Sequence, residues 1–257
     1  SWNPALGDAG ESREGSIREG DGPPRECIVT SDRFLCPTCQ RTLRESPRGG
    51  GWACSHCAEE FPIVHGIPRF VKGVNYADSF SFQWNKYART QVDKFSGSHT
   101  SEERFFKVTG WPRDMKVHKI LEAGCGSGRF TQIALETGAD VYSFDYSSAV
   151  DACRENNGEN LHNYSDRRPR SEADGGGAPR NLHLFQADIY RIPLPRNSFD
   201  NIFCFGVLQH CPDPRKAFLG LIPFLKPGGE IVIDVYQLTP RIVATPKYWL
   251  RPITKRI

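Results

Sequence analysis

Residues 121–130, Leu-Glu-Ala-Gly-Cys-Gly-Ser-Gly-Arg-Phe, decide the fold of this chain. They follow an apolar run, Val117 to Leu121, that predicts a strand, and they hold three glycines at alternate positions. Glycine lacks a Cβ, so a turn of this kind can be tight and still let a ligand approach its backbone. Arg129 stands where a G-x-G-x-x-G dinucleotide fingerprint has its third glycine, which argues against a nicotinamide cofactor.

A carboxylate follows the next predicted strand. The run Val141 to Asp145 ends in an acid about 20 residues after the glycines, the interval at which a ribose-binding carboxylate belongs in this layout. We therefore expect Asp145 to bind a ribose. The alternative is that Asp145 caps the helix that follows the strand.

Two further segments predict strands, at residues 181–188 and 198–206, and residues 225–234 predict a turn that enters a fifth strand. Segments with helical character alternate with them, and this alternation is typical of parallel strands joined by crossover helices. The sequence therefore predicts an α/β domain with a doubly wound, mostly parallel sheet.

Taken in order, LEAGCGSGRF, FDYS, QADIYRIPLP, SFDNIFCFGVLQHCPDP and LKPGGEIVI resemble the class I S-adenosylmethionine-dependent methyltransferases over roughly residues 76–236. The resemblance implies a Rossmann-like fold and S-adenosyl-L-methionine as the cofactor. It also implies that Glu122 supports the amino group of the cofactor, that Asp145 accepts hydrogen bonds from both ribose hydroxyls, and that Asp188 binds the adenine amino group. Asp188 has the same alternative as Asp145, a helix cap. The other contacts that it implies involve Gly124, Gly126, Gly128, Tyr146, Ile189, Phe205 and Gly206.

His210 is the candidate catalytic residue, because it follows the fourth predicted strand, where residues that face the substrate are common. Methyl transfer is an in-line displacement that depends on positioning, so a base is optional. A near-neutral pKa suits a histidine for removing a proton from a hydroxyl. The alternative is a histidine that only caps the loop. The segment Cys204 to Leu208 is not Asn/Asp-Pro-Pro-Tyr, so the resemblance speaks against the amino-methylating enzymes of nucleic acids.

Four of the nine cysteines form two C-x2-C pairs, Cys36/Cys39 and Cys54/Cys57, with 14 residues between the pairs. This pattern predicts a structural Zn²⁺ bound by four thiolates, with no open position for catalysis. The alternatives are reduced or disulfide-bonded turns, and His56 in place of Cys57. The remaining cysteines show no pairing pattern, which argues against an oxidising compartment and favours the cytoplasm.

The cysteine-bearing segment, residues 34–70, resembles the small zinc-ribbon activator subunit that partners several RNA and protein methyltransferases, here fused in front of the methyltransferase domain. The resemblance implies a platform for a substrate or a protein partner.

The sequence predicts four parts. Residues 1–30 are expected to be disordered, residues 31–72 form the zinc ribbon, residues 73–115 form a helical lid or linker, and residues 116–257 form the methyltransferase domain. The aromatic run at 76–87 either folds over the cofactor or packs against the sheet.

Two stretches of the predicted methyltransferase domain, residues 116–257, are not typical of a compact domain. Residues 156–180 are rich in glycine and charge, so we expect them to be disordered or functional. Residues 236–257 contain basic and aromatic residues where the family has a sixth and a seventh strand, so those strands are expected to be missing. The tail either binds nucleic acid or a membrane surface, or begins a substrate-side helix. The chain starts at Ser1 and its one methionine is Met115, which also favours a fragment.

The composition excludes several classes. The 257 residues are 38% hydrophobic and 25% charged, and no apolar run approaches the roughly 20 residues of a membrane helix. The net charge of +3 does not by itself imply a nucleic-acid partner. We therefore predict a methyltransferase for a small-molecule acceptor. The alternatives are an RNA methyltransferase and a non-catalytic adaptor that binds the cofactor and a protein partner through its ribbon.

Overall fold

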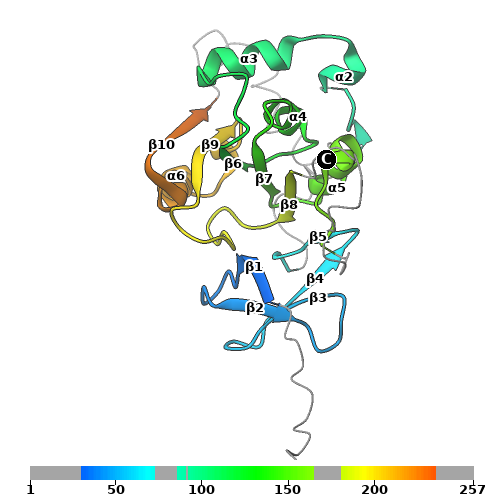
Figure 1. The fold of residues 1–257 in the computed structure, drawn as a ribbon, viewed down its shortest axis with the longest axis vertical. Coiled ribbons are helices and arrows are strands. Elements are labelled where there is room, and N and C mark those ends of the chain that lie inside the picture. The colour runs from blue at the N-terminus through cyan, green and yellow to red at the C-terminus, as the bar shows by residue number, and fades with distance from the viewer. Residues whose placement is uncertain (1–29, 73–85, 91, 165–180, 236–257) are drawn as a thin grey trace, which may run out of the picture.

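Two sheets make up the computed structural model, which describes residues 30–72, 86–90, 92–164 and 181–235 (Figure 1). The N-terminal sheet has five antiparallel strands that pair in chain order. These strands are β1 (Thr30–Leu35), β2 (Thr42–Glu45), β3 (Gly51–Cys54), β4 (Glu60–Val64) and β5 (Ile67–Pro68).

The second sheet is parallel throughout its described strands and has the order β10-β9-β6-β7-β8. Its strands are β6 (Lys119–Ala123), β7 (Asp140–Asp145), β8 (Leu182–Gln186), β9 (Phe199–Phe205) and β10 (Leu225–Asp234). The chain moves outward from β6 in one direction and then, from β9, in the other, which confirms the predicted doubly wound sheet.

One predicted boundary is wrong. The strand expected from Val117 to Leu121 begins at Lys119 and continues to Ala123. Val117 is 90% exposed, so its apolar side chain adds nothing to the core. The two residues gained at the other end, Glu122 and Ala123, are buried, and burial rather than β-branching sets where this strand lies.

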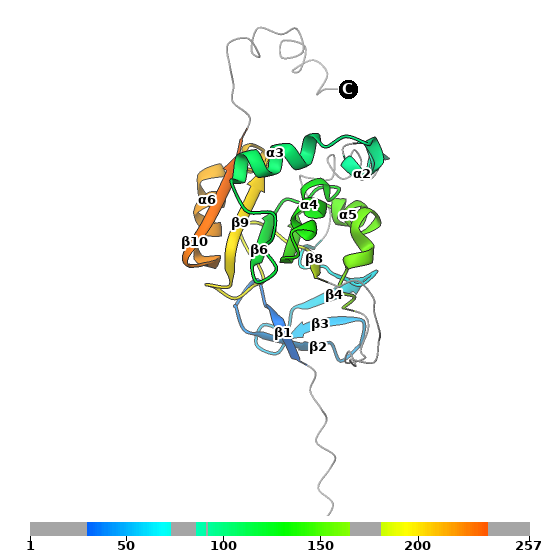
Figure 2. The same ribbon diagram turned by 45° about the horizontal axis from the view of Figure 1, so that its top comes forward.

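Helices cover both faces of the parallel sheet. They are α2 (Asp93–Ser96), α3 (Thr100–Thr109), α4 (Arg129–Glu136), α5 (Ala149–Asn157) and α6 (Pro214–Leu221), with short 3₁₀ turns η1 (Gly158–Asn160), η2 (Leu208–His210) and η3 (Ile222–Phe224). Right-handed crossovers put α4 and α5 on one face and α6 on the other. Figure 2 shows α3 lying across α4 and reaching β10, where Trp111 Nε1 donates to Glu230 at 2.9 Å.

The strands bury side chains on both faces, as parallel strands between two layers do. One core contains residues of β6 to β9 together with α3, α4 and α5, among them Phe105, Ile120, Ile133, Val141, Leu184 and Phe203. The other contains the alternate residues of the same strands, with α6 and the N-terminal sheet, among them Phe34, Leu121, Phe144, Phe185, Ile202 and Leu221.

The N-terminal sheet covers the part of the parallel sheet that no helix covers on the face of α6. Residues 187–198, all of which the structure describes, join β8 to β9 without a helix, so no crossover helix covers this face over β7 and β8. The Phe34 ring lies there instead, 5.2 Å from Phe185 and 5.3 Å from Phe70 between centroids. Figures 1 and 2 both show the N-terminal sheet at this end of the molecule, beside β8.

Backbone hydrogen bonds fix the same contact. Leu35 N donates to Pro193 O at 2.9 Å, and Phe70 N donates to Gln186 O at 2.8 Å. Arg69 forms a parallel bridge with Gln186, so the chain that leaves β5 runs along the outer edge of β8. The two sheets therefore share one core and one set of backbone hydrogen bonds.

Several predictions concern stretches that lie outside the described residues. These are the N-terminal segment, most of the aromatic run before α2, the loop after Tyr164 and the tail after Val235. Disorder, a lid and missing strands there stay predictions, as does the division into four parts. None of the helices in the described part of the chain has the length and apolar character needed to cross a membrane.

Candidate cofactor site

The glycine turn joins β6 to α4 in a backbone conformation that favours glycine at three positions. Gly124, Gly126 and Gly128 have φ of 84°, 52° and 83°. A Cβ at Gly124 would lie 2.3 Å from Val207 Cγ2, and one at Gly128 would lie 2.3 Å from Asn157 Nδ2. Both the backbone conformation and the neighbouring side chains therefore favour glycine at these two positions.

Asp145 ends β7 beside this turn. Its Oδ2 accepts a hydrogen bond from Gly126 N at 3.0 Å, and its Oδ1 accepts from Ser147 N at 2.9 Å and Ser147 Oγ at 2.7 Å. The N-cap of α5 is Ser148, so Asp145 does not cap that helix. The carboxylate instead joins the glycine turn to the end of β7.

Asp188 follows β8 at the same edge of the sheet. Its Oδ1 accepts from Tyr190 N at 2.9 Å, and the described chain forms no helix directly after it, so it is not a helix cap. Ile189 is buried. Tyr146, after β7, is half-buried and its carbonyl accepts from Gln186 Nε2 at 3.0 Å.

The loop after β9 lies at the same carboxyl edge of the parallel sheet. Phe205 is buried, and Gly206 has φ of 70° and donates its N–H to Asp234 O at 2.7 Å. Val207 lies against Gly124. His210 ends η2 and is exposed, and its backbone N–H donates to Val207 O at 2.9 Å. The loop after β9 thus meets the glycine turn at Val207.

Glu122 lies at the end of β6 and is 2% exposed. Its Oε2 accepts from Thr131 Oγ1 at 2.5 Å and from Ser143 Oγ at 2.7 Å. Burial raises the pKa of Glu122 to about 7, and the charge of Asp145 adds to this, although both hydroxyl donors oppose it. The site therefore contains a carboxyl group that titrates near neutrality.

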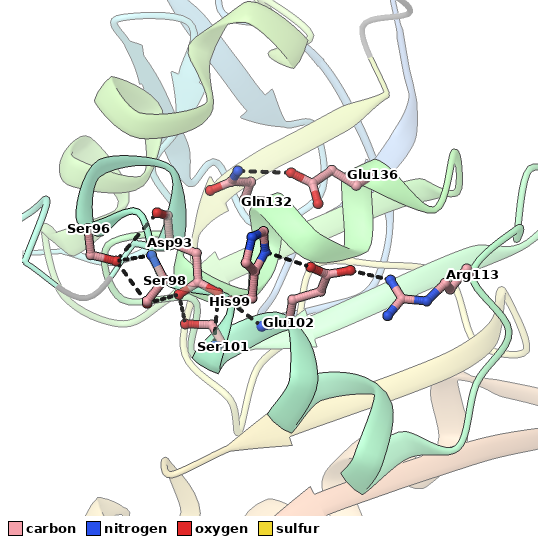
Figure 3. A network of polar contacts seen from close by, with 9 residues as sticks. All are labelled: Asp93, Ser96, Ser98, His99, Ser101, Glu102, Arg113, Gln132 and Glu136. Atoms are coloured by element: carbon pink, nitrogen blue, oxygen red, sulfur yellow. Dashed lines mark hydrogen bonds and ion pairs between the residues drawn. The ribbon is translucent and has the colours of Figure 1, made fainter.

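A polar network that the sequence did not predict joins α2, α3 and α4. Figure 3 shows Asp93, whose carboxylate accepts from Ser101 N at 2.9 Å, Glu102 N at 3.1 Å and Ser101 Oγ at 2.5 Å. Ser101 Oγ also accepts from Arg129 Nε at 2.6 Å. In the sequence, the one feature that could have pointed to this network is Arg129, which replaces the third glycine of the dinucleotide fingerprint.

A second missed residue is Asn156, near the end of α5. Its Nδ2 donates to Ala88 O at 2.9 Å and to Ser127 O at 2.8 Å. One amide therefore joins the segment before α2 to the glycine turn. The three residues are far apart in the chain, and no sequence motif relates them.

The four predicted cysteines form one cluster, with all four sulfur atoms within 4.8 Å of one another. The distances are 3.5 Å for Cys36–Cys57, 3.4 Å for Cys39–Cys54 and 3.8 Å for Cys39–Cys57. A tetrahedron with Zn–S bonds of about 2.3 Å has edges of about 3.8 Å, so the donor set fits Zn²⁺. His56, which is exposed, is not part of the cluster.

The two pairs sit in matching turns. Gln40 N donates to Cys36 O at 2.8 Å, and Ala58 N donates to Cys54 O at 3.0 Å. Gln40 and Ala58 have φ of 58° and 56°, so each turn ends in a left-handed residue. This repeated geometry points the sulfurs of both pairs toward a common centre.

Glu122→Gln is predicted to remove a pH dependence of stability. The folded carboxyl holds its proton up to a pKa of about 7, above its ordinary 4.5, so unfolding releases a proton between these values. Stability due to this group is full below about pH 4.5 and falls by about 3 kcal/mol as the pH rises to about 7. Urea unfolding of both proteins across this range measures the difference. A difference that does not change with pH would contradict the prediction.

The comparison with known proteins independently supports the resemblance to methyltransferases. Residues 121–233 match the family described as a methyltransferase domain. Sterol 24-C-methyltransferase of Pneumocystis carinii is 26% identical over 60% of this chain and 36% of its own length. Phosphoethanolamine N-methyltransferase 2 of Caenorhabditis elegans is 28% identical over 59% of this chain and 33% of its own. The chain thus spans about a third of the length of the first curated relatives that it matches.

Two further likenesses cover more of the chain. The uncharacterized chloroplastic methyltransferase At2g41040 of Arabidopsis thaliana is 22% identical over 94% of this chain and 71% of its own. A solved complex of the Haloferax volcanii Trm112 methyltransferase activator with a methyltransferase has a TM-score of 0.46, at 18% identity, over 71% of this chain and 69% of that one. The strand order and the glycine turn of the described chain agree with this family match over residues 121–233.

Proposed function

We propose that this protein is an S-adenosyl-L-methionine-dependent methyltransferase that acts on a small-molecule acceptor. The observation that carries the proposal is the convergence of the glycine turn, Asp145 and Asp188 at the carboxyl edge of the parallel sheet. Ligands of open α/β sheets bind at this edge, where the strand order reverses. Relatives are named sterol 24-C-methyltransferase, phosphoethanolamine N-methyltransferase and ubiquinone biosynthesis O-methyltransferase, which supports a small acceptor.

Each of the three acidic residues then contacts one part of the cofactor. The glycine turn approaches the methionine part, with Glu122 near its amino group. Asp145 binds the ribose hydroxyls, and Asp188 binds the adenine amino group. The bound cofactor supplies an electrophilic methyl group, and the chain holds it in line with the acceptor and excludes water. The remaining cofactor contacts are assigned to Tyr146, Ile189, Phe205 and Gly206.

Asp145→Ala is predicted to weaken S-adenosylmethionine binding by about 1.5–3 kcal/mol, the scale of hydrogen bonds to a charged group. Titration calorimetry measures the affinity. Asp114→Ala is the matched control, because Asp114 is an exposed aspartate in the loop before β6. Equal affinity of the two variants would remove Asp145 from the site, and no binding by the unaltered chain would overturn the proposed function.

His210 is assigned as the base that removes the acceptor proton. Its exposure at the end of η2, in the loop that contacts the glycine turn, supports this role. Replacing it by glutamine should lower kcat by about 10²–10⁴-fold, because general-base catalysis contributes that much. It should also remove the acidic limb of the pH–rate profile, whereas an unchanged profile would leave His210 a structural residue of the loop.

We also propose that the four-cysteine cluster binds one structural Zn²⁺. Cys36→Ser should abolish binding of the metal, because each thiolate is one of four ligands, and metal binding supplies much of a ribbon's folding free energy. Phe34 and Phe185 share one core, so the thermal unfolding temperature of the parallel-sheet domain should fall as well. Cys211→Ser, outside the cluster, is the control. Metal analysis that finds equal zinc in the two variants would contradict the assignment.

The same measurements separate the other candidate functions. Cofactor binding without turnover on any metabolite would favour an adaptor that acts through the ribbon, and turnover on total RNA would favour an RNA methyltransferase. The eight described cysteines carry no disulfide, which supports the cytoplasm as the proposed location.

A further inference from the structure

A buried histidine lies where the N-terminal sheet meets the parallel sheet. His183 is the second residue of β8, and its side chain is 3% exposed. Polar side chains from three other segments surround its ring: Arg33 of β1, Asp140 and Tyr142 of β7, and His162 and Tyr164 after η1. This cluster lies where β7 and β8 begin, whereas the candidate cofactor site lies where they end, and the proposed cofactor contacts include none of its residues.

One ring nitrogen of His183 faces both a hydrogen-bond donor and an acceptor. Its Nε2 lies 3.0 Å from Arg33 Nη1 and 2.9 Å from Asp140 Oδ1. A guanidinium can only donate, and an ionised carboxylate can only accept. Nε2 can therefore make only one of these two hydrogen bonds at a time. Without a proton it accepts from Arg33, and with a proton it donates to Asp140.

The other ring nitrogen keeps its partner in every protonation state. Nδ1 lies 2.7 Å from the hydroxyl oxygen of Tyr164, and a hydroxyl can donate or accept. When both ring nitrogens carry protons, the ring is a cation that donates to Asp140 and Tyr164. It then offers no acceptor to Arg33, and the two like charges repel each other. Arg33 is exposed, so its side chain can turn away into water.

The surroundings favour the neutral ring. Burial lowers the pKa of His183 below its ordinary 6.5, and the charges of Arg33 and Lys119 lower it further, although Asp140 opposes them. Burial also raises the pKa of Tyr142 and of Tyr164, so both phenols keep their protons over the range in which a histidine titrates. The stability that the neutral ring contributes is therefore full above about pH 6.5, and it is lost as the pH falls through the lowered pKa.

We propose that His183 is a pH-sensitive switch, which holds the N-terminal sheet against the parallel sheet when it is neutral and loosens this contact when it is protonated. Arg33 directly precedes Phe34, whose ring packs 5.2 Å from Phe185 in the shared core. Leu35, the next residue of β1, donates its N–H to Pro193 O at 2.9 Å. Loss of the Arg33 contact therefore acts on the strand that joins the two sheets.

NMR titration of the His183 ring protons tests the arrangement of charges. Arg33→Met removes the cation next to the ring, so the pKa of His183 should rise. Asp140→Asn removes the opposing carboxylate, so this pKa should fall. A pKa at or above 6.5 in the unaltered chain, or one that neither substitution moves, would overturn the proposal.

Hydrogen exchange of the Leu35 amide tests the contact between the sheets. From about pH 7.5 to about pH 5.5, and after correction for the pH dependence of free-amide exchange, its protection should fall about three- to tenfold in the unaltered chain, the scale of one hydrogen bond. His183→Gln has a side chain that stays neutral, so its protection should not change over this range.

The control is the same substitution at another histidine. His99 is exposed and immediately precedes α3, which Figure 1 shows at the end of the molecule opposite the N-terminal sheet. His99→Gln should lose protection of the Leu35 amide as the unaltered chain does. Protection that falls equally in His183→Gln, or that does not fall in the unaltered chain, would overturn the proposal, because the contact would then not depend on the charge of His183.

Discussion

The apolar face of β7 and β8 is the constraint on which the rest of the structure depends. No helix covers it, because residues 187–198 join β8 to β9 without one. Phe34 and Phe70 from the N-terminal part of the chain cover it and pack against Phe185. Fully burying one such ring is worth about 1.5–3 kcal/mol, so uncovering three would remove a large share of a domain's net stability. The ribbon is therefore a structural layer of the parallel-sheet domain and not an appendage to it.

The same contact reaches the candidate site through Gln186, the last residue of β8. Its carbonyl accepts from Phe70 N, its Oε1 accepts from Arg69 Nη1 at 3.4 Å, and its Nε2 donates to Tyr146 O. Gln186 also pairs with Asp145 in the sheet and precedes Asp188 by two residues. Docking of the ribbon consequently fixes the strand end from which both acids project.

The sequence was sufficient for some of these features because their signals are local. Gly124, Gly126 and Gly128 predicted a tight turn, and the spacing of Cys36, Cys39, Cys54 and Cys57 predicted a four-sulfur cluster, since both depend on residues close together in the chain. The packing of Phe34 on Phe185 could not be predicted, because neither residue belongs to a motif and about 150 residues separate them. The predicted start of the strand at Val117 was wrong, because an apolar residue next to a strand need not be buried.

Arg129 connects the local and the long-range features. A glycine there would complete a dinucleotide fingerprint, and its usual role is to let the helix pack closely on the sheet. Here the side chain donates to Ser101 Oγ, and its guanidinium lies 5.0 Å from the Phe130 ring centroid. Ser101 is held in turn by Asp93, and Phe105, one helical turn later, packs 5.3 Å from Phe203. The departure from the dinucleotide pattern therefore supplies the link that makes α3, α4 and the glycine turn one unit, so a displacement of the helices over the sheet would also displace the turn that is proposed to hold the cofactor.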